Sequence, residues 1–381
     1  MFGSRPTEVR RDGGHLGFAG LTANDRASAM LDTASEIPTF VDKASGSLVP
    51  ASGRDGMAAD ALSDLLRTVR LTGATFFDVV ARDPWVAEQP TREMVLPKIL
   101  PGAEHLISYH VVTEGRCYAC IIGEEPIALD AGEVIVYTRG DAHVISSNPG
   151  MRAQPVTSAE MDAATAGPLP FFKRMGDEGP SSVKMVCGFL ACDAHPFNPL
   201  LDNLPPIIKA GNPQGGDANW LGQFIRLARS ESADKRAGGE SVLAKLSELM
   251  FIEVVRQYLE TLPPEQAGWL AGLRDPFVGK ALSMMHASPA RNWTIEELAR
   301  EVALSRSVLA ERFADLVGMP PMHYLAKWRM QIAAGLLSGG NTNMATIAAD
   351  IGYGSEAAFS RAFKKSVGVP PSAWRKRSAA A

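Results

Sequence analysis

Apolar positions along this chain follow three patterns, and each pattern indicates a different kind of structure. Residues 1–56 are rich in Gly, Ser, Ala, Asp and Arg and show no sustained period, which is typical of a disordered segment. Residues 58–70 place Leu and Val on one side of a predicted helix, and short runs of aromatic and β-branched residues then follow up to residue 190. Helical spacing returns from residue 196 onward.

The short runs predict a β-structure. The expected strands cover residues 76–80, 95–100, 106–112, 117–122, 127–129, 134–137, 143–145 and 183–190, with hairpin turns at residues 114–115 and 123–124. This number of short strands favours a small β-barrel or jelly roll. Residues 149–181 are rich in Pro, Gly and Ala and are expected to form a mobile loop.

Two helices are expected next, at residues 218–233 and 241–262, separated by Gly238 and Gly239. The second carries an apolar stripe that includes Leu243, Leu246 and Leu249. Such a stripe is compatible with ordinary core packing or with a dimer interface, and the sequence leaves both open.

The carboxyl-terminal pattern predicts two helix-turn-helix units. Thr294 and Glu297 form a capping box at the start of one helix, and Ser305 caps the next helix, residues 306–316. A long helix at residues 321–337 separates this unit from the second, residues 344–366. In the second unit a Gly-containing turn precedes a helix that carries its aromatic residues four positions apart, on one face.

The outward faces of the two second helices are the candidate DNA-reading surfaces, because helices of this kind enter the major groove. Their residues are Arg306, Ser307, Ala310, Glu311 and Arg312 in the first, and Ser355, Glu356, Ala357, Ser360, Arg361 and Lys364 in the second. Arginine binds guanine or phosphate, and a glutamate accepts a hydrogen bond from cytosine. A solvated charge is the default alternative for Glu311 and Glu356.

The string from Met344 to Arg375 resembles the signature of AraC/XylS-type transcription regulators, with Ile351-Gly352-Tyr353, Phe359 to Lys364 and Gly368-Val369-Pro370-Pro371 at matching spacings. The resemblance implies an α+β multidomain protein with a cupin-like sensor barrel at residues 57–195. A helical linker or dimerisation segment at residues 196–272 and a double helix-turn-helix domain at residues 273–378 would follow. It also implies a cytoplasmic homodimer that binds promoter DNA, contacts RNA polymerase and activates transcription in response to an effector.

Residues 132–143 resemble the second cupin motif, with Thr138 where proline is usual and His143 at the metal-histidine position. The first motif is poorly met, because Ser108 stands where the metal-binding glutamate would fall. The absence of this four-ligand set disfavours an enzyme. A cupin metalloenzyme fused to a DNA-binding domain remains the alternative function, and a nonspecific chromatin binder is a third.

Four side chains are candidates for a site that binds zinc or senses an oxidant. His110 and His143 share the inward strand parity, Cys187 lies mid-strand, and Cys120 is expected to face inward with them. Two imidazoles and a thiolate make a plausible zinc site. Buried core residues without a metal are the other interpretation. Cys117 and Cys120 are three residues apart and would face opposite sides of a strand, so a shared metal ion or a local disulfide would require a bend in the strand.

Charge is divided unevenly along the chain. From Asp275 onward 13 Lys and Arg face 8 Asp and Glu, a net charge of +5, whereas the preceding residues carry 25 against 34, a net charge of −9. A basic tail on an acidic body fits contact with nucleic acid. No apolar run approaches the roughly 18 residues that span a membrane, and no secretion-signal pattern opens the chain. We therefore expect cytoplasmic, reduced thiols.

Overall fold

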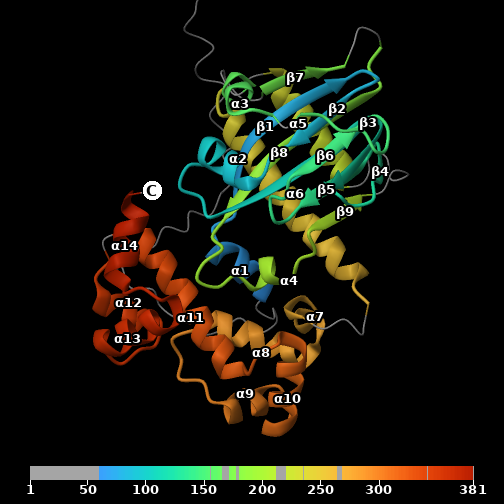
Figure 1. Ribbon diagram of the computed structural model, residues 1–381. Helices are drawn as coiled ribbons and strands as arrows, with labels where there is room; N and C mark the ends of the chain where they lie inside the picture. Colours follow the sequence, from blue (N-terminus) through green and yellow to red (C-terminus); the bar gives the residue numbers. More distant parts are fainter. Residues whose placement is uncertain are drawn as a thin grey trace, which may run out of the picture. The chain divides into compact units, whose positions relative to one another are not determined.

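A curled β-sheet precedes a set of carboxyl-terminal helices, and Figure 1 shows its strands in blue and green. The structure is a computed structural model that describes residues 60–154, 156–164, 171–176, 180–211, 220–234, 236–263, 268–340 and 342–380. The predicted disorder of residues 1–56 therefore lies outside the described residues.

The sheet confirms the prediction of a cupin-like β-fold. Hydrogen bonds join six strands in the order β2-β6-β3-β8-β1-β7; β4 pairs with β3, and β5 pairs with both β3 and β9. A hydrophobic core lies on one face, where side chains of β1, β3, β5, β6 and β8 meet. The strands are β1 (Thr72–Ala81), β2 (Val86–Gln89), β3 (His105–Ile121), β4 (Ile127–Asp130), β5 (Glu133–Tyr137), β6 (His143–Ser146), β7 (Phe171–Met175), β8 (Val183–Cys192) and β9 (Ile207–Gly211).

β3 is one strand of 17 residues, where the sequence predicted two strands joined by a hairpin turn at residues 114–115. Its first part pairs with β5 and β8, and its last part pairs with β4 and β6. The register against β8 shifts between Val112 and Glu114, which marks a bulge. Gly115 has a φ of +81°, and a Cβ there would lie 2.0 Å from the Ser182 carbonyl oxygen. The hairpin prediction was wrong because this glycine allows the strand to bend without reversing.

Two further segments differ from the prediction. Residues 95–100, expected as a strand, belong to helix α2 (Arg92–Ile99), which contains Pro97. Val95 is its buried residue and packs with Leu106 and Phe189, so a single apolar contact face is enough to hold the helix. The expected loop at residues 149–181 contains helix α3 (Ser158–Ala164) and edge strand β7, which runs parallel to β1.

The segment after β8 is not purely helical, as had been expected, because β9 adds to the sheet beside β5. The two predicted helices are confirmed as α5 and α6, and α6 packs against β1. A Cβ on Gly73 of β1 would lie 2.1 Å from the Ala244 carbonyl oxygen of α6, so this contact requires glycine. The helices of this part are α4 (Pro199–Asn203), α5 (Trp220–Asp234), α6 (Gly239–Thr261) and α7 (Trp269–Arg274).

Two helix-turn-helix units follow, as predicted, in orange and red in Figure 1. Their second helices have 12 residues each, both begin at a serine N-cap, and both end at a glycine with positive φ. The repeat places one packing face and one outward face in each unit. The helices are α8 (Pro276–Ala287), α9 (Ile295–Glu301), α10 (Arg306–Val317), α11 (Pro321–Ser338), α12 (Met344–Asp350), α13 (Glu356–Val367) and α14 (Pro371–Ala380).

Candidate nucleic-acid interface and sensor cavity

The candidate DNA-contacting residues lie on the outward faces of α10 and α13. The hydroxyl of Ser305 accepts a hydrogen bond from the Val308 N–H at 3.3 Å, and Ser355 caps α13 in the same way at 3.2 Å. Of the candidates, Ala310 and Ser360 are half-buried and the others are exposed. The local signals of the sequence therefore orient both helices as expected.

The two arginines of α10 form different ion pairs, which indicates different roles for them. Arg312 donates to the Asp275 carboxylate at 2.8 Å and its guanidinium lies 5.3 Å from the Phe277 ring centre. Asp275 also accepts from two backbone N–H groups as the N-cap of α8. Arg312 thus joins α10 to α8, which is a structural role. Arg306 forms an exposed pair with Glu296 at 3.0 Å, which DNA phosphates can displace.

In α13 the basic residues point away from an aromatic core. Phe359 and Phe363 are fully buried, and their ring centres lie 5.6 Å apart. Arg361 and Lys364 are exposed, and within the described residues neither takes part in an ion pair. Cations without protein partners are available to phosphate oxygens.

The sheet brings two of the four predicted metal ligands together. His110 of β3 and His143 of β6 are buried, and their Nε2 atoms lie 2.8 Å apart. Nδ1 of His143 is 2.8 Å from the Asp141 carbonyl oxygen, so we assign the proton there. His110 then donates from Nε2 to His143. Burial lowers the pKa of His110 well below its usual value and lowers the pKa of His143 to about 4, so both rings are neutral at pH 7.

The two predicted cysteine ligands lie differently. Cys187 is the cross-strand neighbour of His110 and lines the same cavity. The bulge in β3 reverses the strand parity that the sequence suggested. As a result Cys117 lies in the hydrophobic core with Cys187, and Cys120 lies outside that core. The inward placement of Cys120 was therefore wrong. Across the described ranges, no group of three or more His, Cys, Asp or Glu side chains is placed to hold a metal ion.

The buried thiols are weak candidates for reaction with oxidants. Burial raises the pKa of Cys117 to about 12, and it also raises the pKa of Cys187 and of Cys192. Burial raises the pKa of the half-exposed Cys120 as well. Since the thiolate is the reactive form, each of these groups is poorly activated in this conformation.

A largely apolar cavity of about 110 Å³ opens on the face of the sheet that carries His110. Most of its walls are aliphatic, aromatic or methionine side chains, and Gln89, His110, Lys173 and Cys187 add the polar groups. Two of these groups have unsatisfied buried atoms in the described structure, Gln89 at Nε2 and His110 at Nδ1. Buried atoms of this kind usually have a water or ligand partner.

Sequence reasoning missed Gln89 and Lys173 as cavity residues. Lys173 lies in the region that was expected to be a loop. A recognisable signal was present, since Phe171, Lys173 and Met175 alternate with the exposed Phe172 and Arg174 as they would on a half-buried strand. The run has only five residues, and it is surrounded by Pro and Gly.

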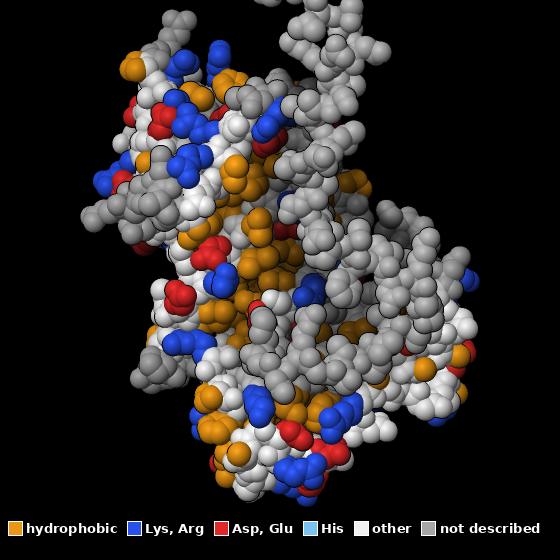
Figure 2. Space-filling model, turned by 180° about the vertical axis from the view of Figure 1, so that it is seen from behind, with side chains coloured by type: hydrophobic (Ala, Val, Ile, Leu, Met, Phe, Trp, Pro, Cys, Tyr) orange, Lys and Arg blue, Asp and Glu red, His pale blue; other side chains and the backbone are white. Residues whose placement is uncertain are grey.

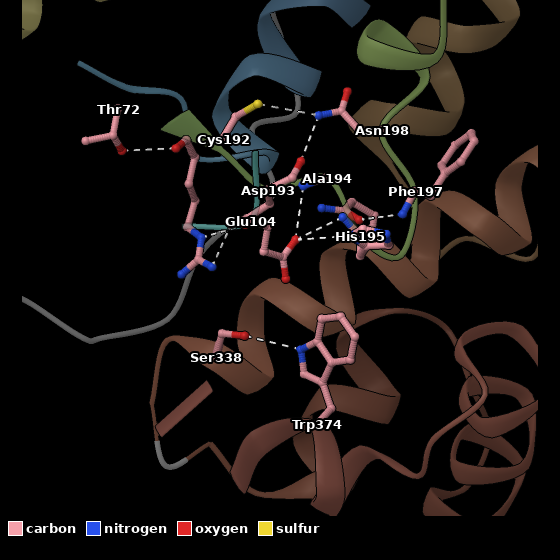
Figure 3. A network of polar contacts seen from close by, with 12 residues as sticks. Thr72, Glu104, Cys192, Asp193, Ala194, His195, Phe197, Asn198, Ser338 and Trp374 are labelled. Atoms are coloured by element: carbon pink, nitrogen blue, oxygen red, sulfur yellow. Dashed lines mark hydrogen bonds and ion pairs between the residues drawn. The ribbon is translucent and has the colours of Figure 1, made fainter. Parts of the chain in front are cut away.

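Two strands of the cavity wall continue into segments that contact the helix-turn-helix helices. β8 leads into residues 193–198, and Figure 3 shows their polar network. Within it the Glu104 carboxylate accepts from the N–H groups of Ala194 and His195, both at 3.0 Å. The Phe197 N–H then donates to Gln331 Oε1 of α11 at 2.9 Å.

The second strand, β1, is preceded directly by helix α1 (Ala61–Thr68). Leu62 and Leu65 of α1 share a hydrophobic core with Val278 and Leu282 of α8. The start of β1 is also held by α6, because the Gly73 N–H donates to the Glu248 carboxylate at 3.0 Å. β1 and β8 are therefore connected along the chain to segments that contact α8 and α11 through a hydrophobic core and a hydrogen bond.

Comparisons with known proteins agree with this division of the chain. Residues 60–260 match the family described as Cupin, and residues 298–377 match a Helix-turn-helix domain. An AraC-like transcription regulator of Streptomyces lividans is 35% identical over 72% of this chain and 88% of its own length. Another from Streptomyces antibioticus is 33% identical over 83% and 98%. An Escherichia coli relative, the RCS-specific HTH-type transcriptional activator RclR, is 26% identical over 72% and 86%. Among the described residues, no helix is long and apolar enough to cross a membrane.

Proposed function

Because the chain belongs to the AraC-like DNA-binding transcription regulators and carries a cupin domain, we propose that its sheet binds a signal molecule that controls promoter binding. One observation carries the proposal: the strands that line the sensor cavity, β1 and β8, run directly into the segments that touch α8 and α11. The relatives are named as regulators rather than enzymes, so the metalloenzyme alternative is not favoured.

The two reading helices would occupy successive major grooves, which lie about 34 Å apart on one face of the duplex. Arg361 and Lys364 would hold phosphates, since they are exposed and have no ion pair within the described residues. Glu356, Ala357 and Ser360 lie at the start of α13, where base edges are within reach. Arg306 would exchange its pair with Glu296 for a phosphate or a guanine.

Signal binding controls DNA binding only if the signal prefers one arrangement of the chain. A molecule in the cavity would press on β1 and β8 at Phe77, Val79 and Phe189, which line it. β1 would carry the displacement to α1 and so to α8. β8 would carry it to Phe197 and through the hydrogen bond to Gln331 of α11. This coupling would then change the positions of the two DNA-reading helices, α10 and α13, relative to one another.

A homodimer would form through the outer face of α5 and α6. Leu227, Val242 and Leu249 are exposed at 55%, 42% and 62%. Figure 2 shows hydrophobic side chains gathered on the side of the molecule seen from behind, where α5 and α6 lie in Figure 1. A seven-residue spacing, typical of paired helices, relates Val242, Leu249 and Arg256 of α6. The charged Arg256 marks the end of this apolar row.

We further propose that the protein activates transcription and contacts RNA polymerase. The support is the resemblance to the AraC-type signature and the name of the Escherichia coli relative. A reporter gene joined to a bound promoter tests it directly. Lower expression in the presence of the protein would contradict activation.

A metal ion is the second candidate signal. The facing Nε2 atoms of His110 and His143 favour it, because two imidazoles also approach one another when they share an ion such as zinc. Cys187 is the cross-strand neighbour that could add a thiolate. Metal analysis of the purified protein, beside His143→Ala, tests this idea. Equal and negligible metal in both proteins would remove it.

The DNA-binding mechanism is tested by titrating promoter fragments at several salt concentrations. Arg361→Ala should weaken binding and reduce the salt slope by about one unit, as expected for one lost phosphate contact. Arg174→Ala, an exposed arginine of β7, is the matched control and should change neither. An unchanged slope for Arg361→Ala would contradict the phosphate role. Equal affinity of the wild type for every duplex would instead indicate a nonspecific chromatin binder.

A further inference from the structure

The cavity is lined by one cationic side chain, Lys173, which interacts electrostatically with Glu160 of α3 but forms no ion pair with it within the described residues. Lys173 lies on β7, where Phe171, Lys173 and Met175 are half-buried and the residues between them are exposed. No carboxylate of the described chain forms an ion pair with Lys173. A half-buried ammonium group beside an apolar cavity is stabilised by an anion that reaches it from inside.

The rest of the cavity is unsuited to a strongly polar ligand. The histidine at its wall is neutral; its Nε2 atom is already used by His143, and its Nδ1 atom is one unpaired acceptor. Gln89 adds the two N–H donors of its amide nitrogen Nε2, which has no hydrogen-bond partner in the described residues. The remaining lining is mostly apolar: Phe77, Val79, Ala87, Pro90, Ile99, Ile145, Val156, Met161, Met175, Met185, Gly188 and Phe189. A sugar would leave most of its hydroxyl groups without partners, and each unpaired buried hydroxyl is costly.

The volume restricts the size of the ligand. The cavity of about 110 Å³ is somewhat smaller than the roughly 150 Å³ cavity that binds benzene in an engineered protein. Met161, Met175 and Met185 line it, and methionine side chains adapt to the shape of a guest at low cost. A body of one small ring or a short branched chain fits this description.

We propose that the signal is a small apolar monocarboxylate whose body fills the cavity and whose carboxylate pairs with Lys173, assisted by the Gln89 amide. This inference rests on the proposed sensor function and names the chemical class of its ligand. The contact would draw the edge strand β7 toward its neighbour β1. Because β1 follows α1, the same contact lies on one route to the reading helices.

The test uses isothermal titration of the full chain with benzoate and with its neutral counterpart benzyl alcohol at pH 7. Benzoate should bind more tightly than benzyl alcohol. Lys173→Met, which keeps an apolar stem, should weaken benzoate binding by about tenfold or more and leave benzyl alcohol nearly unchanged. Arg174→Met is the matched control, since Arg174 is exposed on the other face of β7. It should leave both affinities unchanged.

Each outcome separates the ligand class from the regulator function. Equal affinities for the two probes, or full benzoate binding by Lys173→Met, would overturn the carboxylate assignment and leave the cavity as a sensor. Binding of neither probe, with promoter retardation intact, would overturn the ligand class alone. Circular dichroism monitors the fold, and Lys173→Gln provides a second substitution if Lys173→Met fails to fold.

Discussion

Replacement of Gly352 by alanine should destabilise the second helix-turn-helix unit by about 2–5 kcal/mol. Gly352 has a φ of +80°, and the left-handed conformation costs an L-residue about 1–2 kcal/mol. A Cβ at this position would also lie 2.3 Å from the Ala290 carbonyl oxygen. Relief of such an overlap typically costs about 1–3 kcal/mol. The two contributions add to the stated range.

The obstructing carbonyl cannot move away easily, because its neighbours are held on both sides. Arg329 of α11 donates to the Pro289 carbonyl at 2.7 Å and to the Arg291 carbonyl at 2.9 Å. The loop that contains Ala290 is therefore fixed to the helix that joins the two units. The substitution should loosen the turn before α13 and weaken DNA binding along with stability.

The first unit supplies a matched control. Ala303 occupies the corresponding turn with a φ of 57° and is exposed. Ala303→Gly removes the left-handed strain without creating an overlap, although glycine also makes the unfolded chain more flexible. We therefore expect between no change and a gain of about 1 kcal/mol. Urea denaturation followed by circular dichroism measures both variants. A Gly352→Ala protein within about 0.5 kcal/mol of the wild type would refute the steric reasoning.

Three further predictions concern pH, coupling and assembly. Burial lowers the pKa of His143 to about 4 and of His286 to about 3, so the unfolded state binds more protons below pH 6.5. The free energy of unfolding should be level above pH 6.5 and fall toward pH 4. His143 alone should account for a loss on the order of 3 kcal/mol. Urea titrations from pH 4 to 8 that show no fall in the free energy of unfolding would contradict this. Gln331→Met removes the acceptor for the Phe197 N–H and should lower the free energy of unfolding by about 1–3 kcal/mol. It should also reduce the effect of ligand on DNA binding, which promoter titration with and without benzoate measures. Leu249→Glu should give a monomer in sedimentation analysis at concentrations where the wild type is a dimer, and a monomeric wild type would remove the proposed interface.

The helix-turn-helix part of this protein could be derived from sequence because its determinants are local. Ser305 and Ser355 cap helices within the next turn, and Phe359 and Phe363 lie one turn apart. Glycine turns follow from single-residue backbone preferences. The structural role of Arg312 could be assigned only from the fold, because its partner, Asp275, lies 37 residues earlier in the sequence.

The arrangement of the cupin part was decided mostly by tertiary structure, because strand pairing joins residues that are far apart in sequence. The bulge in β3 reversed the strand parity on which the prediction for Cys120 depended. The approach of His110 to His143 spans 33 residues, and the contact of Phe197 with Gln331 spans 134. Periodicity identifies which residues can form strands, whereas register, bulges and packing determine which side chains meet in a cavity.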